Sequence, residues 1–226
     1  MIKEAEKFAG TVICDILTSV NSLYNGIEAD QKIWKARSRI QCPDGCGSCC
    51  VRFEPEVYEA EALYLAAWML EHQSERADRI AEADSDSFTR GDGCFLFDPD
   101  SPYHCTVYEG RCLICRLFGF SGDHGKDGAI RWKPCKYMQL SRTATDGTFD
   151  VQTGHKYGQE EMMRLFGAVP PYMGAASSSL LALNPDDTHP RPLRIALPAA
   201  IKKLKMLLRF ITPPEPDCPS PHPLSA

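Results

Sequence analysis

The sequence predicts a mainly α-helical protein whose helices pack around a central, irregular region that is rich in cysteine and has little β structure. Two observations support this fold class. Apolar residues recur every three to four positions near both ends of the chain, which is the period of an amphipathic helix. Between residues 84 and 130, glycine and proline repeatedly interrupt the chain, as is typical of loops and turns.

Four helices can be placed from their apolar spacing. The longest is predicted over residues 3–38, with a stripe formed by Phe8, Val12, Ile16, Val20, Leu23 and Ile27. A second is predicted from Pro55 to about residue 83, because proline is tolerated in the first turn of a helix. Shorter helices are predicted over residues 160–166 and 199–211. The basic face of the last one is interpreted as a solvated surface.

These elements suggest four parts of the chain. Residues 1–39 form an N-terminal helix, and residues 40–140 form a cysteine-cluster domain. Residues 141–212 form a helical extension packed on the same core. Residues 213–226 contain six prolines in fourteen positions, so we expect a disordered tail there.

Composition indicates a soluble cytoplasmic protein. The hydrophobic fraction is 43%, and no apolar run approaches the roughly 20 residues that span a bilayer. The first twenty residues lack the features of a signal peptide, because Glu4, Glu6 and Asp15 interrupt them. A net charge of −5 argues against nucleic acid as a partner.

The cysteines carry the strongest functional signal. Nine of the eleven lie between Cys42 and Cys135, and we refer to these nine as the clustered cysteines. Cytoplasmic thiols are kept reduced, so such crowding favours metal ligation over disulfides. A redox-active dithiol is an alternative interpretation. Soft thiolates select zinc, cuprous copper or the iron of iron–sulfur clusters. A metal would also restrain the irregular segment.

Three blocks of the chain resemble a known family. They are CPDGCGSCC at residues 42–50, CFLFDPDSPYHCTVYEGRCLICRLFGF at residues 94–120 and KPCKYM at residues 133–138. In this order they resemble the YkgJ-like cysteine-cluster family of zinc- or iron-chelating CxxCxxCC domains. The resemblance implies a metal-ligand set of eight residues: Cys42, Cys46, Cys49, Cys50, Cys94, Cys105, Cys115 and Cys135.

The ninth clustered thiol departs from the family pattern. Cys112 stands where the family usually has proline, and we expect it not to be a ligand because eight thiols already fill two four-coordinate sites. Residues 105–136 carry an excess of three positive charges in an otherwise acidic chain. We assign Arg116, next to Cys115, to cofactor binding through charge compensation. A solvated basic loop is the alternative.

Three functions remain open from the sequence. The bound metal could be zinc or iron, the latter including a 4Fe-4S cluster, and its role could be structural. It could instead serve redox or group-transfer chemistry, since some family members are described as flagellin lysine methylases. A zinc-stabilised module for a protein partner is the third function. His104, His124 and His155 are further candidate ligands or acid–base groups. No nucleotide-binding loop and no catalytic constellation are evident, so the sequence names no substrate.

Overall fold

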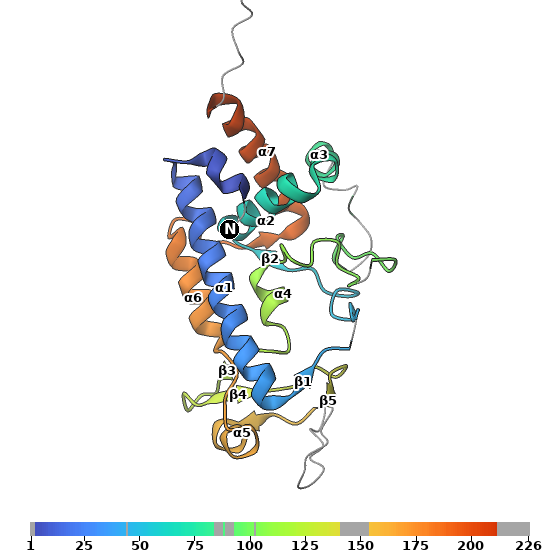
Figure 1. Cartoon of the computed structure of the whole chain (residues 1–226), viewed down its shortest axis with the longest axis vertical. Helices are drawn as coiled ribbons and strands as arrows, with labels where there is room; N and C mark the ends of the chain where they lie inside the picture. Colours follow the sequence, from blue (N-terminus) through green and yellow to red (C-terminus); the bar gives the residue numbers. More distant parts are fainter. Residues whose placement is uncertain are drawn as a thin grey trace, which may run out of the picture.

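The computed structural model describes residues 3–43, 45–83, 88, 93–101, 103–140 and 154–211. Of these residues, 54% are helical and 9% lie in short strands, which confirms the prediction of a mainly α fold (Figure 1). None of the described helices has the length and apolar character that crossing a membrane requires. The tail expected at residues 213–226, including Cys218 and His222, lies outside the described residues.

The first predicted helix is two helices. The short 3-10 helix η1 spans Lys3–Phe8, and the long helix α1 spans Val12–Ser38. The chain turns between them at Gly10, whose φ of 77° is a conformation that glycine adopts without strain. The Thr11 side chain then caps α1 by accepting a hydrogen bond from the Cys14 backbone N–H, at 3.4 Å. A polar cap and a glycine therefore override the continuous apolar stripe.

One apolar core surrounds the first half of α1. It is built with helices α2 (Glu59–His72), α3 (Ser74–Glu82), α6 (Met173–Leu183) and α7 (Leu193–Ile211). Tyr64, Leu65 and Met69 of α2 are buried here, and Trp68 is half-buried. The basic face of α7 is partly neutralised, because Lys203 and Lys205 pair with Glu59 and Asp78.

The boundaries of three helices differ from prediction. Pro55 does not open a helix; its carbonyl accepts a hydrogen bond from the Leu193 N–H at 3.0 Å, and strand β2 (Glu56–Val57) follows it. This strand pairs antiparallel with β7 (Arg191–Pro192). The predicted helix is also divided at Gln73, whose side chain donates to the Thr106 carbonyl at 2.6 Å. Helix α7 starts six residues before the predicted position 199. The sequence did not predict helix α6.

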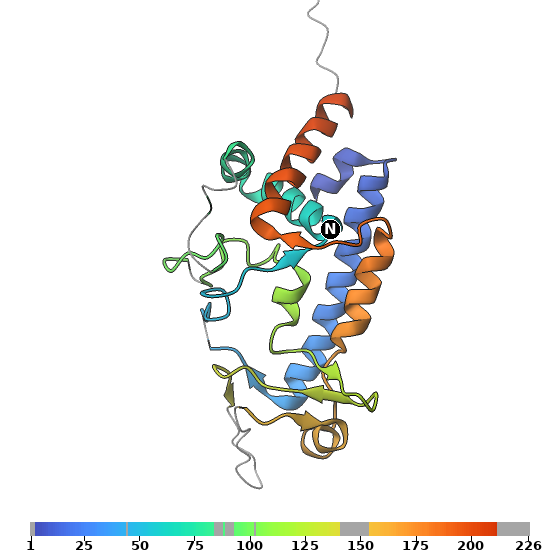
Figure 2. The same cartoon turned by 180° about the vertical axis from the view of Figure 1, so that it is seen from behind.

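A second apolar cluster surrounds the other end of α1. Trp34 makes edge-to-face contacts with Trp132 and Phe166, with ring centroids 5.4 and 5.3 Å apart. The cluster is enclosed by helix α5 (Gln159–Phe166) and by two small sheets. One sheet consists of strands β3 (Asp123–His124), β4 (Ile130–Trp132) and β6 (Tyr157–Gly158). The other consists of strands β1 (Ile40–Gln41) and β5 (Gln139–Leu140). Helix α1 thus connects both clusters, and the cysteine-rich loops lie beside it (Figure 2).

A buried carboxylate ties the cysteine-rich part to the helices. Glu61 on α2 is only 4% exposed. It accepts hydrogen bonds from the Leu113 N–H at 2.7 Å, from the Tyr58 N–H at 3.2 Å and from the Tyr24 hydroxyl at 3.3 Å. Leu113 begins the short helix α4 (Leu113–Leu117). Burial raises the pKa of Glu61, and the hydrogen bonds oppose that shift.

Removing this carboxylate should destabilise the whole protein. We expect Glu61→Ala to lower the free energy of unfolding by about 1–3 kcal/mol, because the buried Leu113 N–H loses its acceptor. Urea unfolding of the unaltered protein, of Glu61→Ala and of Glu75→Ala would measure this loss. Glu75→Ala is the control because it removes an exposed glutamate of α3. Equal midpoints and slopes for the two variants would contradict the role assigned to Glu61.

Candidate metal centre

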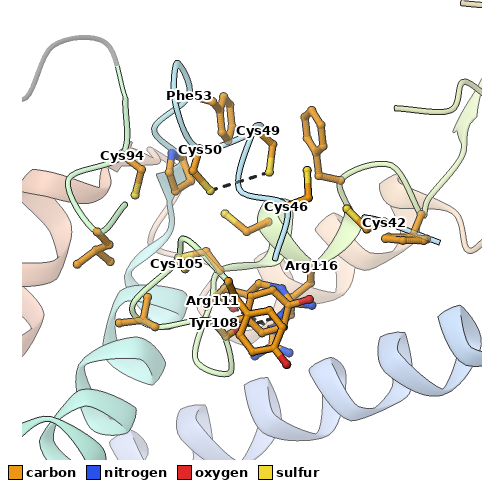
Figure 3. A pocket seen from close by; sticks show the side chains of 18 of the residues that line it. Cys42, Cys46, Cys49, Cys50, Phe53, Cys94, Cys105, Tyr108, Arg111 and Arg116 are labelled. Atoms are coloured by element: carbon orange, nitrogen blue, oxygen red, sulfur yellow. Dashed lines mark hydrogen bonds between the residues drawn. The ribbon is translucent and has the colours of Figure 1, made fainter. Parts of the chain in front are cut away.

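All nine clustered cysteines line a single cavity of about 110 Å³, which we call the thiol chamber. Figure 3 shows side chains of the first block facing those of the later blocks across this space. Aromatic and aliphatic side chains supply most of the remaining wall. The chamber is bordered by both apolar clusters, because Leu65 belongs to one and Met138 to the other. The cysteines in its wall are Cys42, Cys46, Cys49, Cys50, Cys94, Cys105, Cys112, Cys115 and Cys135.

Close backbone approaches bring the first cysteine block against the second. A Cβ placed on Gly47 would lie 2.2 Å from the Cβ of His104, so only glycine fits at this contact. The Cys50 N–H donates to the Gly47 carbonyl at 2.8 Å, which turns the chain at the adjacent cysteines. The Cys94 N–H in turn donates to the Cys50 carbonyl at 3.1 Å. These contacts join thiols that are more than forty positions apart in the sequence.

Two further anchors hold the walls of the chamber. Glu54, just after the first block, accepts hydrogen bonds from the backbone N–H and the guanidinium Nε of Arg194 at 2.8 and 2.6 Å. In the second block, Phe97 and Cys105 form an antiparallel bridge, and the Thr106 N–H donates to the Leu96 carbonyl at 3.2 Å. Cys94 and Cys105 therefore lie on one compact loop.

The guanidinium of Arg116 holds the loop that carries Cys112 and Cys115. Arg116 is 3% exposed, and it forms an ion pair with Glu28 of α1. It also donates to the carbonyls of Arg111, at 2.8 Å, and Glu109. Its carbon Cζ lies 4.2 Å from the centre of the Tyr24 ring. Arg116 lines the chamber, and each of its three guanidinium nitrogens donates to a group of the protein. Its assignment to cofactor binding stays a prediction.

Two other cations line the chamber. Arg111 stacks over the Tyr108 ring at 3.9 Å, and Lys35 of α1 lies 4.1 Å from the Phe120 ring centre. Burial and the charge of Arg111 lower the pKa of Lys35. No carboxylate is among the described residues that line the chamber. Sequence reasoning missed Lys35, which precedes the first cysteine block and lies outside all three blocks.

Burial favours the protonated form of most of the thiols. Burial raises the pKa of Cys42 to about 12 and that of Cys94 to about 11. Burial also raises the pKa of Cys105 and Cys115. Neighbouring cysteines add to each shift, because two thiolates repel. Binding of a metal to these groups therefore releases protons.

The adjacent residues Cys49 and Cys50 differ from each other. Their sulfurs are 3.9 Å apart, and a hydrogen bond from the Cys50 thiol lowers the pKa of Cys49 to about 6. The positive charge of Arg111 acts in the same direction. The same hydrogen bond, together with burial, raises the pKa of Cys50. The first proton of the pair is therefore lost more easily than the second.

The neighbours that perturb each thiol fall into two sets. Cys42 is influenced by Cys46, Cys135 and Cys49. Cys50 is influenced by Cys49, Cys105 and Cys115, and Cys115 in turn by Cys94, Cys105 and Cys49. Cys49 therefore lies between a set formed with Cys42, Cys46 and Cys135 and a set formed by Cys50, Cys94, Cys105 and Cys115.

Cys112 differs from the other eight in its surroundings. Its side chain is 2% exposed and packs within the larger apolar cluster. Burial raises its pKa far above the usual value of a thiol. Although it reaches the chamber wall, Cys112 behaves as a small apolar residue.

The donor set fits a thiophilic metal by its chemistry. Thiols in one cavity match the ligands that zinc and iron–sulfur clusters take. Within the described residues, however, no three His, Cys, Asp or Glu side chains converge as ligands of one ion. The candidate histidines lie outside the chamber wall: His104 packs beside Phe97, His124 stacks on Tyr172, and His155 pairs with Glu161.

Comparison with known proteins agrees with the chemistry of the thiol donors. Residues 41–140 match the CxxCxxCC family model, described as "Putative zinc- or iron-chelating domain". The match covers less than half of the chain. The resemblance inferred from the three sequence blocks is confirmed over residues 41–140. No curated protein and no solved structure matched the chain.

The acidity of Cys49 can be tested in metal-free, reduced protein. We expect Cys49 to be alkylated first, with a rate that rises with pH up to about 6 and then levels, because the thiolate is the nucleophile. Mass spectrometry after short treatment with iodoacetamide would identify the modified residue. In Cys50→Ala the hydrogen-bond donor is gone, so the midpoint should move upward. A Cys49 rate that still climbs above pH 8 would contradict the assignment.

Proposed function

We propose that the protein binds zinc or iron through clustered cysteine thiolates. The observation that carries this proposal is the collection of nine thiols in one chamber, whose described wall contains cations and no carboxylate. Thiolates without carboxylates suit zinc or iron–sulfur centres and do not suit magnesium or calcium. The match of residues 41–140 to a zinc- or iron-chelating domain supports the same conclusion.

Two four-cysteine centres account best for the arrangement. We assign Cys42, Cys46, Cys49 and Cys135 to one centre and Cys50, Cys94, Cys105 and Cys115 to the other. The division follows the neighbours that perturb Cys42, Cys50 and Cys115, among which Cys49 is common to both sets. Cys49 is placed with Cys135 because these two residues also line one neighbouring groove. Cys112 takes no part because it is packed within the apolar cluster.

The protein's own residues would support these centres in two ways. The cysteine-bearing loops must draw together, because no three of the described ligand-type side chains converge. Each four-thiolate centre with a dication carries a net negative charge, which Lys35, Arg111 and Arg116 would offset at the chamber wall. A bound metal supplies a covalent restraint on the loops, or redox chemistry if it is an iron–sulfur cluster.

Elemental analysis after anaerobic purification tests the proposal. We expect two zinc ions per chain in colourless protein, or iron with acid-labile sulfide and broad absorbance near ~400 nm if clusters are present. Protein that holds neither metal, and whose thiols all react freely with an alkylating reagent, would refute the function.

Single substitutions test the division into two centres. Cys42→Ser and Cys115→Ser should each lower the metal content by roughly half, since each removes a ligand of one four-cysteine site. Cys112→Ala is the matched control, because it removes a thiol of the same chamber and should leave the content unchanged. Complete loss of metal in both ligand variants would show a single shared centre. Loss in the control would show that Cys112 is a ligand.

A further inference from the structure

A second cavity adjoins the thiol chamber. This space of about 860 Å³, which we call the basic groove, has the size of a site for a small molecule. The two cavities share Cys49, Cys135, Phe118 and Tyr137 in their walls. The groove therefore offers a route from solvent to two of the thiols that we assign to one metal centre.

The charge of the groove has one sign. Arg52, Lys133 and Lys136 line it, all three are exposed, and no carboxylate is among its described lining residues. Within the described part of the chain, none of these three cations makes an ion pair, although the protein as a whole carries a net charge of −5. Together with Lys35 and Arg111 of the chamber, they create a local positive field in an acidic protein.

Such a field acts against a free metal cation. An aquated zinc or ferrous ion that approaches Cys49 through the groove passes fixed positive charges and is repelled. A metal complexed by carboxylates carries net negative charge and is attracted. Guanidinium and ammonium groups also bind carboxylate oxygens directly, through charge-assisted hydrogen bonds.

We propose that the basic groove receives the metal as an anionic complex with a small polycarboxylate and delivers it to Cys49 and Cys135. This inference rests on the proposed metal-binding function. Delivery is a ligand exchange without change of oxidation state. Each sulfur replaces one carboxylate oxygen on the metal, a thiol that was protonated releases its proton to the departing chelator or to solvent, and the free polycarboxylate leaves through the groove.

The sign of the salt dependence distinguishes the two forms of metal. Metal-free, reduced protein is mixed under anaerobic conditions with zinc citrate in excess citrate, or with zinc sulfate in a non-coordinating buffer, and loading is followed by loss of reactive thiols. We expect loading from zinc citrate to slow as ionic strength rises, because salt screens attraction. Loading from zinc sulfate should become faster, because salt screens repulsion. If the metal proves to be iron, ferrous citrate and ferrous sulfate replace the zinc salts.

Charge reversal locates the effect. Lys133→Glu combined with Lys136→Glu should slow loading from zinc citrate roughly tenfold or more and accelerate loading from zinc sulfate. The matched control is Lys202→Glu combined with Arg209→Glu, which makes the same charge change on the exposed face of α7. The control should change both rates little.

The metal content at equilibrium distinguishes failure of the delivery route from failure of the proposed metal-binding function on which it rests. Full metal content after long incubation, with loading from citrate that is insensitive to salt and to the groove variant, would overturn the delivery route alone. A groove variant and a control that slow loading equally would also overturn it, because only the net charge would matter. Absence of bound metal from either source at equilibrium would instead refute the proposed function.

Discussion

The ion pair between Arg116 and Glu28 is the contact on which the cysteine-rich region depends. Arg116 is almost completely buried, and a buried guanidinium is tolerated only when its donors are paired. Here the partners are a carboxylate of α1 and carbonyls of the loop at Glu109 and Arg111. The loop thereby becomes attached to the longest helix, and Gln31 strengthens the attachment by donating to the Arg116 carbonyl at 2.7 Å. Cys112 and Cys115 are held at the chamber as a result.

The chamber lies where the apolar packing is interrupted. One cluster surrounds the start of α1 and the other surrounds Trp34, and the loops beside the helix bring nine thiols together among aromatic and aliphatic side chains. Ordering loops without regular secondary structure has a cost in conformational entropy. Polar anchors such as Glu61 and the pair of Glu54 with Arg194 recover part of that cost. Metal ligation would supply the remainder in our proposal, so metal binding and folding of this region would be coupled.

Periodicity and family pattern predicted different parts of the structure. The mainly helical fold, α5 and most of α7 follow from apolar spacing, and the CxxCxxCC domain follows from three cysteine blocks. The break at Gly10 and the strand after Pro55 depend on a backbone turn and on pairing with Arg191–Pro192, which spacing does not encode. Helix α6 was missed because its run of small residues has little amphipathic contrast. Lys35 was missed because it lies outside the cysteine blocks and only the folded chain brings it beside the thiols. The set of eight ligands came from the family resemblance and stays a prediction.

X-ray absorption spectroscopy, at the absorption edge of the metal in anaerobically purified protein, tests most directly whether thiolates alone hold the metal. Four sulfur neighbours per metal, at about 2.3 Å for zinc, are the result that the proposed centres predict. For iron, sulfur neighbours and a short iron–iron distance would indicate a cluster held by the same thiols. A coordination shell dominated by nitrogen or oxygen would contradict the claim, because the described chamber wall offers no histidine and no carboxylate.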